Sequence, residues 1–181
     1  DVIYYSTLTS FADLMKHGCT CAFDHQYCYT RKTGKSPVDR QMEAAELLGI
    51  RYHAGRGTNT LPGSEGSSIP DNMLETTDEF LKDCDTLIGL YHDSGPFSMR
   101  QIVMAPCQPI NCRRETFAET VAMAREKGVR MHTHLGEGEN EGMMARWGKR
   151  TMDWCGEMGF IGEDVWYAHD WEVTKEEYRV L

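Results

Sequence analysis

Residues 117–137 read FAETVAMAREKGVRMHTHLGE and contain the clearest pattern of secondary structure in the chain. Apolar side chains recur at helical spacing over Phe117–Ala124, and the short β-like run Val129–His134 follows after Gly128. Glycine just beyond a helix is a common C-terminal cap, because it adopts the left-handed backbone without steric cost. The stretch therefore predicts a helix, a glycine stop and a strand, with polar residues where the strand ends.

The same order of helix, glycine and strand is repeated along the chain, as in KHGCTCAF (16–23) and LLGIRYHA (47–54). The expected helices are Leu8–Met15, Met42–Leu48, Phe80–Leu90, Phe117–Ala124 and Met143–Met158. The expected strands are Cys19–Phe23, Ile50–Ala54, Ile102–Pro106, Val129–His134 and Val165–His169. Most strands begin roughly 30 residues after the one before, which is the size of a strand–helix–strand unit. This alternation predicts a parallel sheet with helices outside it, either doubly wound or closed as a barrel.

Polar residues at the strand ends favour the barrel. No G-x-G-x-x-G motif follows the first strand and no P-loop is present, so a dinucleotide-binding sheet loses support. Chemically active side chains stand at or just beyond the expected strand ends: His25, Arg56, Cys107, His134, Glu137 and His169. That rim carries the active site of (β/α)8 barrels, which need roughly 250 residues. We therefore predict one domain over residues 1–181, an α/β fold of (β/α)8 TIM-barrel type that is incomplete, with about five β/α units.

Composition limits the partners. The chain has 181 residues with a net charge of −9, and an acidic surface repels phosphate backbones, so we expect no nucleic acid partner. No apolar run is long enough for a membrane helix, and no signal peptide precedes the first helix, so we expect no membrane association. Seven cysteines predict free thiols in a reducing cytoplasm. The spacing of Cys19 and Cys21 does not match a zinc ribbon, and packing on one side of a strand explains the pair.

The strongest local signal for chemistry lies at the end of the opening stretch. Residues two apart on a strand share a face, so His132 and His134 point the same way. A neutral imidazole is a good zinc ligand, and a carboxylate beside it, here Glu137, can accept and return a proton. The structural alternative is two core histidines with satisfied hydrogen bonds and a solvated glutamate. The rest of the acidic run 137–141 is expected to be a solvated helix start.

Three other residues are candidates for the same rim. His169 ends the next strand, where it could orient the attacking hydroxide or polarise a substrate, or could be an ordinary core histidine. His25 follows Asp24 and offers a polar group to a pocket. Cys107 could line the pocket or act as a nucleophile, although nothing in the sequence marks it as activated. The loop over residues 57–72 is rich in Gly, Ser and Pro, which is typical of a lid or substrate loop.

These motifs together resemble the amidohydrolase superfamily. The segments MHTHLGE (131–137) and WYAHD (166–170) resemble its LHTHLAE and WLAHA segments. Upstream, GCTCAFDHQYCY, GIRYHAGRGTNTLPGSEGSSIPD, LIGLYHD and RQIVMAPCQP appear in order. This ordered set is similar to the branch that contains the 8-oxoguanine (isocytosine) deaminases and triazine hydrolases, and it covers nearly the whole chain.

The resemblance implies a role for each candidate. The expected strands become strands 2 to 6 of the barrel, with His134 as the metal ligand of strand 5 and Glu137 as the acid/base residue. His169 would contact the hydrolytic water or the substrate. Arg56, Cys107 and His25 would border the substrate. The implied reaction is hydrolytic deamination with zinc, or iron or manganese in its place. The expected substrate is a small aminated heterocycle, first 8-oxoguanine or a related purine or pyrimidine.

Two departures leave alternatives open. The family's first-strand H-x-H pair and eighth-strand aspartate lie outside these residues, so His134 is the single family metal ligand here, while catalytic zinc normally takes three protein ligands. Gly136 and Asp170 replace alanines of the family pattern. The alternatives are a triazine chlorohydrolase or aminohydrolase, or a non-catalytic fragment without a metal site. We expect this chain alone to be inactive, and the parent enzyme to be a cytoplasmic homo-oligomer.

Overall fold

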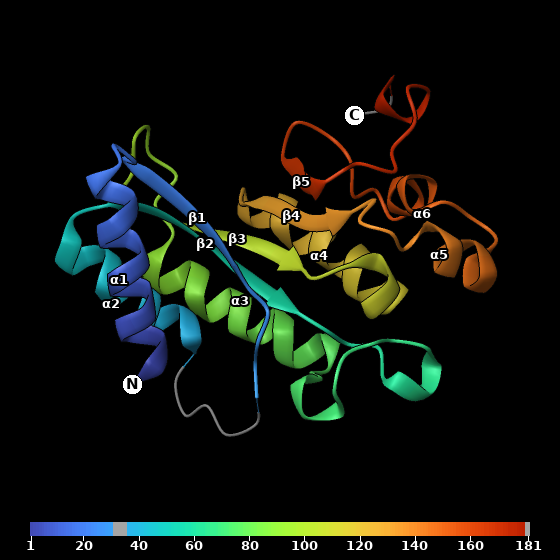
Figure 1. Ribbon diagram of the computed structural model, residues 1–181, viewed down its shortest axis with the longest axis horizontal. Helices are drawn as coiled ribbons and strands as arrows, with labels where there is room; N and C mark the ends of the chain where they lie inside the picture. The colour runs from blue at the N-terminus through green and yellow to red at the C-terminus, as the bar shows by residue number, and fades with distance from the viewer. Residues whose placement is uncertain (31–35, 180–181) are drawn as a thin grey trace.

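The computed structural model describes residues 1–30 and 36–179, and its centre is one sheet of five parallel strands (Figure 1). The strands lie in chain order, β1-β2-β3-β4-β5, and each parallel neighbour is reached through a helical crossover. The strands are β1 (Cys21–Gln26), β2 (Arg51–Thr58), β3 (Arg100–Pro106), β4 (Arg130–Leu135) and β5 (Val165–His169). The helices are α1 (Val2–Lys16), α2 (Pro37–Leu48), α3 (Thr77–Tyr91), α4 (Arg114–Lys127), α5 (Asn140–Trp147) and α6 (Thr151–Glu157).

Local sequence explains where these elements begin and end. Pro37 opens α2 at a position where the missing N–H is not needed. Thr76 and Glu79 form a reciprocal capping box at the start of α3. Gly128 ends α4 with a φ of 68°, a left-handed conformation that an L side chain adopts only at a cost. The helix–glycine–strand pattern predicted for residues 117–134 is confirmed.

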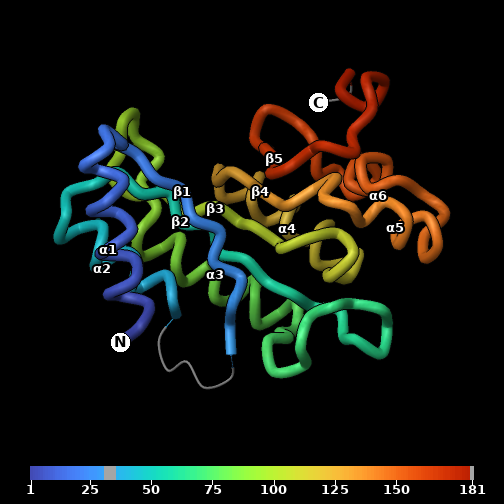
Figure 2. The backbone as a smooth tube through the Cα atoms, viewed as in Figure 1, coloured from blue at the N-terminus to red at the C-terminus, as the bar shows by residue number. Residues whose placement is uncertain are grey.

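The sheet curls into part of a barrel. Phe23 of β1 packs against His132 of β4 and Trp166 of β5, with ring centroids 4.7 and 5.1 Å apart. Strands β2 and β3 separate β1 from β4 in the sheet, so these contacts require the sheet to close on itself. The predicted incomplete (β/α)8 barrel is confirmed, and α1 lies across the molecule from the segment that follows β5 (Figure 2).

The main core lies between the outer face of the sheet and the helices. Tyr52, Ala54 and Ile102 of β2 and β3 are buried in one cluster with Phe11 and Leu87 from the helices. A second cluster buries residues of β3 and β4 against α3, α4 and α6. The helices therefore hold the strands in place from outside, and the concave face keeps its own set of aromatic and polar side chains. No helix in the part of the chain that the structure describes is long and apolar enough to cross a bilayer.

Two local predictions were wrong. The helix expected over Met143–Met158 is two helices, because Gly148 adopts a φ of 65° and ends α5. The Asn140 side chain then accepts a hydrogen bond from the Thr151 N–H at 2.9 Å and so caps α6. The first strand begins at Cys21 rather than Cys19, and the Cys21 side chain is exposed. Packing inside a strand therefore does not explain the cysteine pair.

Candidate active site

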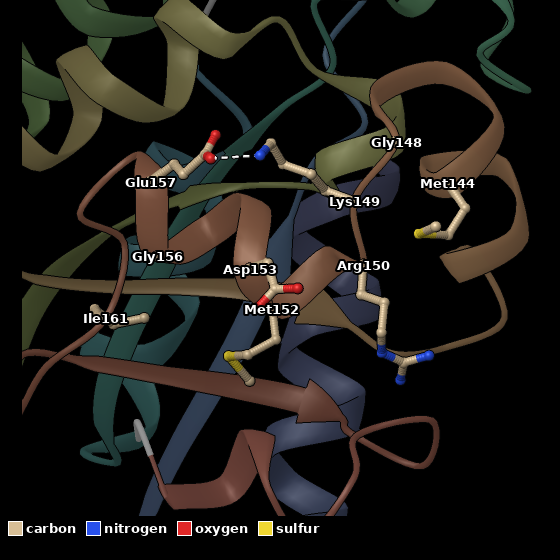
Figure 3. A pocket seen from close by; sticks show the side chains of 9 residues that line it. All are labelled: Met144, Gly148, Lys149, Arg150, Met152, Asp153, Gly156, Glu157 and Ile161. Carbon is tan, nitrogen blue, oxygen red and sulfur yellow. Dashed lines mark ion pairs between the residues drawn. The ribbon is translucent and has the colours of Figure 1, made fainter.

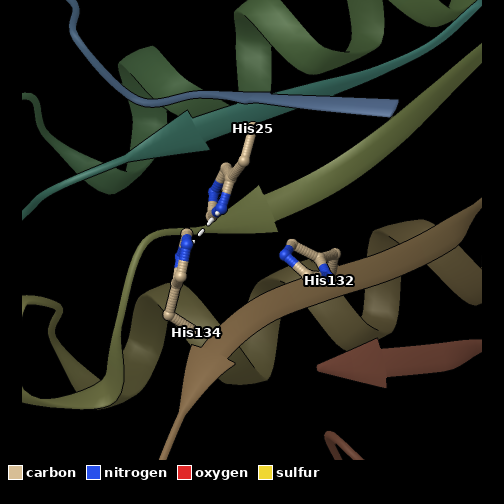
Figure 4. A group of neighbouring side chains, drawn as sticks. All are labelled: His25, His132 and His134. Atoms are coloured by element: carbon tan, nitrogen blue, oxygen red, sulfur yellow. Dashed lines mark hydrogen bonds between the residues drawn. The ribbon is translucent and has the colours of Figure 1, made fainter. Parts of the chain in front are cut away.

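Three histidines meet on the concave face of the sheet. His25 comes from β1, and His132 and His134 from β4 (Figure 4). One ring nitrogen from each lies within 4.8 Å of the others. The rings of His25 and His134 are stacked, with centroids 4.7 Å apart and planes at 12°. The two-residue period of β4 brings His132 and His134 to this face, as the sequence predicted.

Backbone carbonyls fix the orientation of two of these rings. His25 Nε2 lies 2.7 Å from the Ala105 carbonyl oxygen, and His132 Nδ1 lies 3.0 Å from the Trp166 carbonyl oxygen. A carbonyl only accepts, so those two nitrogens carry the hydrogens. Metal-binding histidines are usually held in this way, with one N–H on a carbonyl and the bare nitrogen turned to the ion. The donor set therefore fits a metal centre.

Electrostatics keeps the three imidazoles neutral. Burial, followed by the neighbouring His132, lowers the pKa of His25 to about 3. Burial and the neighbouring His134 lower the pKa of His132 to about 4. Burial, followed by His169, also lowers the pKa of His134. Because the neutral imidazole is the form that binds zinc, these rings are ready to act as ligands at neutral pH.

Glu137 and His169 stand beside this group. The centroids of His134 and His169 are 5.0 Å apart, and His169 Nε2 lies 3.4 Å from Glu137 Oε1. His169 and Asp170 both have positive φ, 78° and 56°, which side chains other than glycine seldom adopt. The strain turns the chain at the end of β5, next to the site, where such residues often have a function. The structure thus brings together four of the predicted site residues: His25, His134, Glu137 and His169.

Two further residues that the sequence analysis missed shape this site. Glu139 was expected to be solvated, but it is buried and its carboxylate accepts hydrogen bonds from the Gly136 and Glu137 N–H groups, both at 2.7 Å. It therefore fixes the turn that presents Glu137. Gln108 Nε2 donates to Glu137 Oε2 at 2.5 Å. Neither role leaves a local signal in the sequence, because both depend on which groups the fold brings together.

Arg56 lies on the opposite face of β2. The neighbouring Gly57 faces the interior, since a Cβ built there would be 2.8 Å from His25 Nε2. Adjacent strand residues point to opposite faces, so the Arg56 side chain is directed toward the helices. It is 1% exposed and pairs with Glu75 and Asp83, each at 2.7 Å. The prediction that Arg56 borders a substrate pocket on the concave face was therefore wrong, and its side chain is part of the core.

Cys107 adjoins the site but is not an activated nucleophile. Its thiol is buried, and burial raises its pKa well above the ordinary value, so the reactive thiolate is not populated. Its carbonyl oxygen accepts from the His134 N–H at 3.0 Å and from Thr133 Oγ1 at 3.1 Å. Cys107 therefore helps to fix the end of β4. Contact between Cys107 and a substrate stays a prediction.

A separate hollow lies on the outside of the molecule, between α5 and α6 (Figure 3). Met144, Met152 and Ile161 form its apolar part. Lys149 Nζ and Glu157 Oε1 pair at 2.7 Å on its border. None of the predicted site residues lines this hollow, so the histidine group on the concave face is the candidate active site.

Comparison with known proteins now identifies the class. The Amidohydrolase family model matches residues 1–181, and the chain belongs to this family. It is 57% identical over 174 residues to hydroxydechloroatrazine ethylaminohydrolase of Pseudomonas sp. (strain ADP), covering 96% of this chain and 36% of that protein. It is 33% identical to 8-oxoguanine deaminase of Pseudomonas aeruginosa, covering 97% of this chain and 39% of that protein.

Solved structures agree with the fold. The structure of atrazine chlorohydrolase TrzN from Arthrobacter aurescens TC1 complexed with zinc matches with a TM-score of 0.93 and 32% identity. The match covers 98% of this chain and 39% of that one. The chain therefore spans less than two fifths of the length of these relatives. The predicted resemblance to this family and branch is confirmed, with hydrolases and deaminases among the relatives.

Proposed function

We propose that the whole protein containing this chain is a metal-dependent hydrolase that removes an amino or alkylamino group from a hydroxylated triazine ring. The observation that carries the chemistry is the grouping of His134, Glu137 and His169 on the concave face of the sheet. The substrate class rests on the relative at 57% identity, whose name describes an ethylaminohydrolase of hydroxydechloroatrazine. This substrate replaces 8-oxoguanine as the first candidate, since the 8-oxoguanine deaminase is 33% identical.

Zinc is the metal we propose, with iron or manganese as the alternatives. His134 would be a ligand from this chain, with two further ring nitrogens beside it: His25 Nδ1, which lies 3.0 Å from His134 Nδ1, and His132 Nε2. A bound divalent metal lowers the pKa of water toward about 7 and so supplies a nucleophile at neutral pH. The relative solved with zinc supports this choice of metal.

The residues of this chain would then move the proton. The oxygen of the attacking water bonds to the ring carbon that bears the amino group, and Glu137 accepts the proton released. Glu137 then gives that proton to the departing nitrogen as the C–N bond breaks, which leaves a hydroxylated ring and a free amine. His169, whose Nε2 is 3.4 Å from Glu137 Oε1, would orient the water or the ring. Proton transfer of this kind contributes about 10²–10⁴-fold to a rate.

Amine release from the whole protein tests this proposal. We expect a hydroxytriazine with an ethylamino substituent to yield ethylamine, identified by mass spectrometry, at a higher kcat/KM than ammonia release from 8-oxoguanine. Ammonia from 8-oxoguanine with no ethylamine from the triazine would contradict the substrate class. The absence of any amine from either ring, in protein with stoichiometric metal, would contradict the reaction. In the same assay we expect the 181-residue chain alone to be inactive.

A further inference from the structure

A line of hydrogen-bonded side chains joins the loop after β2 to Glu137. Ser67 Oγ donates to Asn111 Oδ1 at 2.9 Å, and Asn111 Nδ2 donates to Gln108 Oε1 at 3.1 Å. Gln108 Nε2 then donates to Glu137 Oε2 at 2.5 Å. The four residues lie on three separate segments of the chain, so the fold alone brings them together.

The direction of these bonds is fixed along the whole line. Ser67 Oγ accepts from the Ile69 N–H at 3.2 Å, so its own hydrogen is free to go to Asn111. The Asn111 amide oxygen is then the acceptor, and its NH₂ group faces the Gln108 oxygen. The Gln108 NH₂ group therefore faces the Glu137 carboxylate, which in its ionised form only accepts hydrogen bonds. Each amide has one orientation that satisfies both of its neighbours.

The anchor of the line is buried. Asn111 is 4% exposed, and its backbone carbonyl oxygen accepts hydrogen bonds from the Thr60 and Leu61 N–H groups at 3.2 and 3.0 Å. Gln108 is half-buried, whereas the Glu137 side chain is 44% exposed. A glutamate with that exposure has several rotamers open to it unless a neighbour holds it. Gln108 holds Oε2, while Oε1 remains on the side of His169.

We propose that Gln108 is a positioning residue for Glu137, and that the loop after β2 sets Gln108 through Ser67 and Asn111. The inference rests on the proposed function, since it concerns the residue proposed there as the acid/base group. A carboxamide neither gives nor takes a proton at neutral pH, so Gln108 acts by holding the carboxylate at one angle. The loop that the sequence marks as a lid or substrate loop is thereby coupled to the proton carrier.

Kinetics of Gln108→Ala in the whole metal-loaded protein test this role. We expect kcat to fall about 10–100-fold, the range found when second-layer hydrogen bonds at metal sites are removed. KM should stay within about twofold, and the bound metal should not change, because the side-chain hydrogen bonds of Gln108 in the described residues go to Glu137 and Asn111 and not to a histidine. The matched control is Gln101→Ala, on the preceding strand β3, where the amide bonds Ser98 and the Asp93 carbonyl instead. A raised KM with unchanged kcat would overturn the proposal in favour of direct substrate contact.

A double-mutant cycle shows whether the effect passes through Glu137. In a Glu137→Gln background, Gln108→Ala should lower kcat by less than about twofold further, since there is no carboxylate left to position. A full additional loss would overturn the proposal. Ser67→Ala should show a smaller loss of kcat than Gln108→Ala. Ser67 is the half-buried end of the hydrogen-bonded line, so its replacement carries less risk of unfolding the protein than a change at buried Asn111.

A readout without substrate separates this inference from the proposed reaction. With ¹³C-labelled glutamate, the Glu137 carboxyl resonance is the one that disappears in Glu137→Gln. We expect it to shift in Gln108→Ala and in Ser67→Ala, and to stay in place in Gln101→Ala. A shift in protein that releases no amine would support the positioning while contradicting the reaction. An unmoved resonance in Gln108→Ala would overturn the positioning whatever the reaction proves to be.

Discussion

Replacing Glu137 by glutamine in the whole protein is expected to lower kcat by about 10²–10⁴-fold while the bound metal is unchanged. Glutamine keeps the size of the side chain and a hydrogen-bonding oxygen, but it cannot accept the proton of the attacking water. The metal should stay bound because Glu137 is not one of the proposed metal ligands. Its carboxylate oxygen Oε1 lies 3.4 Å from His169 Nε2. The measurement is amine release at saturating substrate, with metal content determined on the same sample.

The matched control is Glu141→Gln. Glu141 is an exposed glutamate in the first turn of α5, four residues along the chain, and it carries the same charge change. We expect its kcat to stay within about twofold of the unmodified protein, because no proton transfer depends on it. Equal activity of Glu137→Gln and the unmodified protein would remove Glu137 from the mechanism.

Replacing Arg56 by methionine is expected to lower the free energy of unfolding by about 3–5 kcal/mol. The guanidinium is 1% exposed, bonds Glu75 through two nitrogens at 2.7 and 2.8 Å, and bonds Asp83 at 2.7 Å. It also stacks over the Tyr29 ring at 3.5 Å. Methionine fills the space but leaves two partly buried carboxylates without their charged partner and with one hydroxyl donor each, from Thr58 and Ser36, and that desolvation is the main cost.

Urea unfolding of the whole protein measures this loss, and an exposed pair provides the comparison. Arg113 also makes a two-point contact with a glutamate, Glu65, but its side chain is 38% exposed and that of Glu65 48%. Arg113→Met should therefore cost about 0–1 kcal/mol. Equal losses at the two sites would show that burial does not set the strength of the Arg56 cluster.

The order of helices and strands was predictable because it depends on short-range patterns. Apolar spacing, the glycine after each helix and the polar strand ends all lie within a few residues of one another. That His25 lies near the residues of β4 was also predictable, since parallel strands end at the same rim of a barrel. The break between α5 and α6 could not be predicted from apolar spacing, because that spacing continues across Gly148, whose left-handed backbone ends α5.

The wrong role of Arg56 has a different cause. Its place near a strand end was predicted, but the face on which it lies depends on the phase of the strand. Gly55 and Gly57 leave room for Phe23 and His25 on the concave face, so Arg56 between them must point outward. The hydrogen bonds of Gln108 and Glu139 could not be predicted from the sequence. The bond from Gln108 to Glu137 joins segments that are distant in the chain, and the bonds to Glu139 depend on the left-handed turn at Gly136.

We propose above that the concave face around His134 holds a catalytic metal beside Glu137 and His169. Anomalous diffraction at the zinc edge, from crystals of the whole protein, tests it most directly. We expect one strong peak within bonding distance of His134, on the side where the ring nitrogens of His25 and His132 lie. A peak elsewhere, with His134 unligated in protein that releases amine, would show that the catalytic metal is not held at this site.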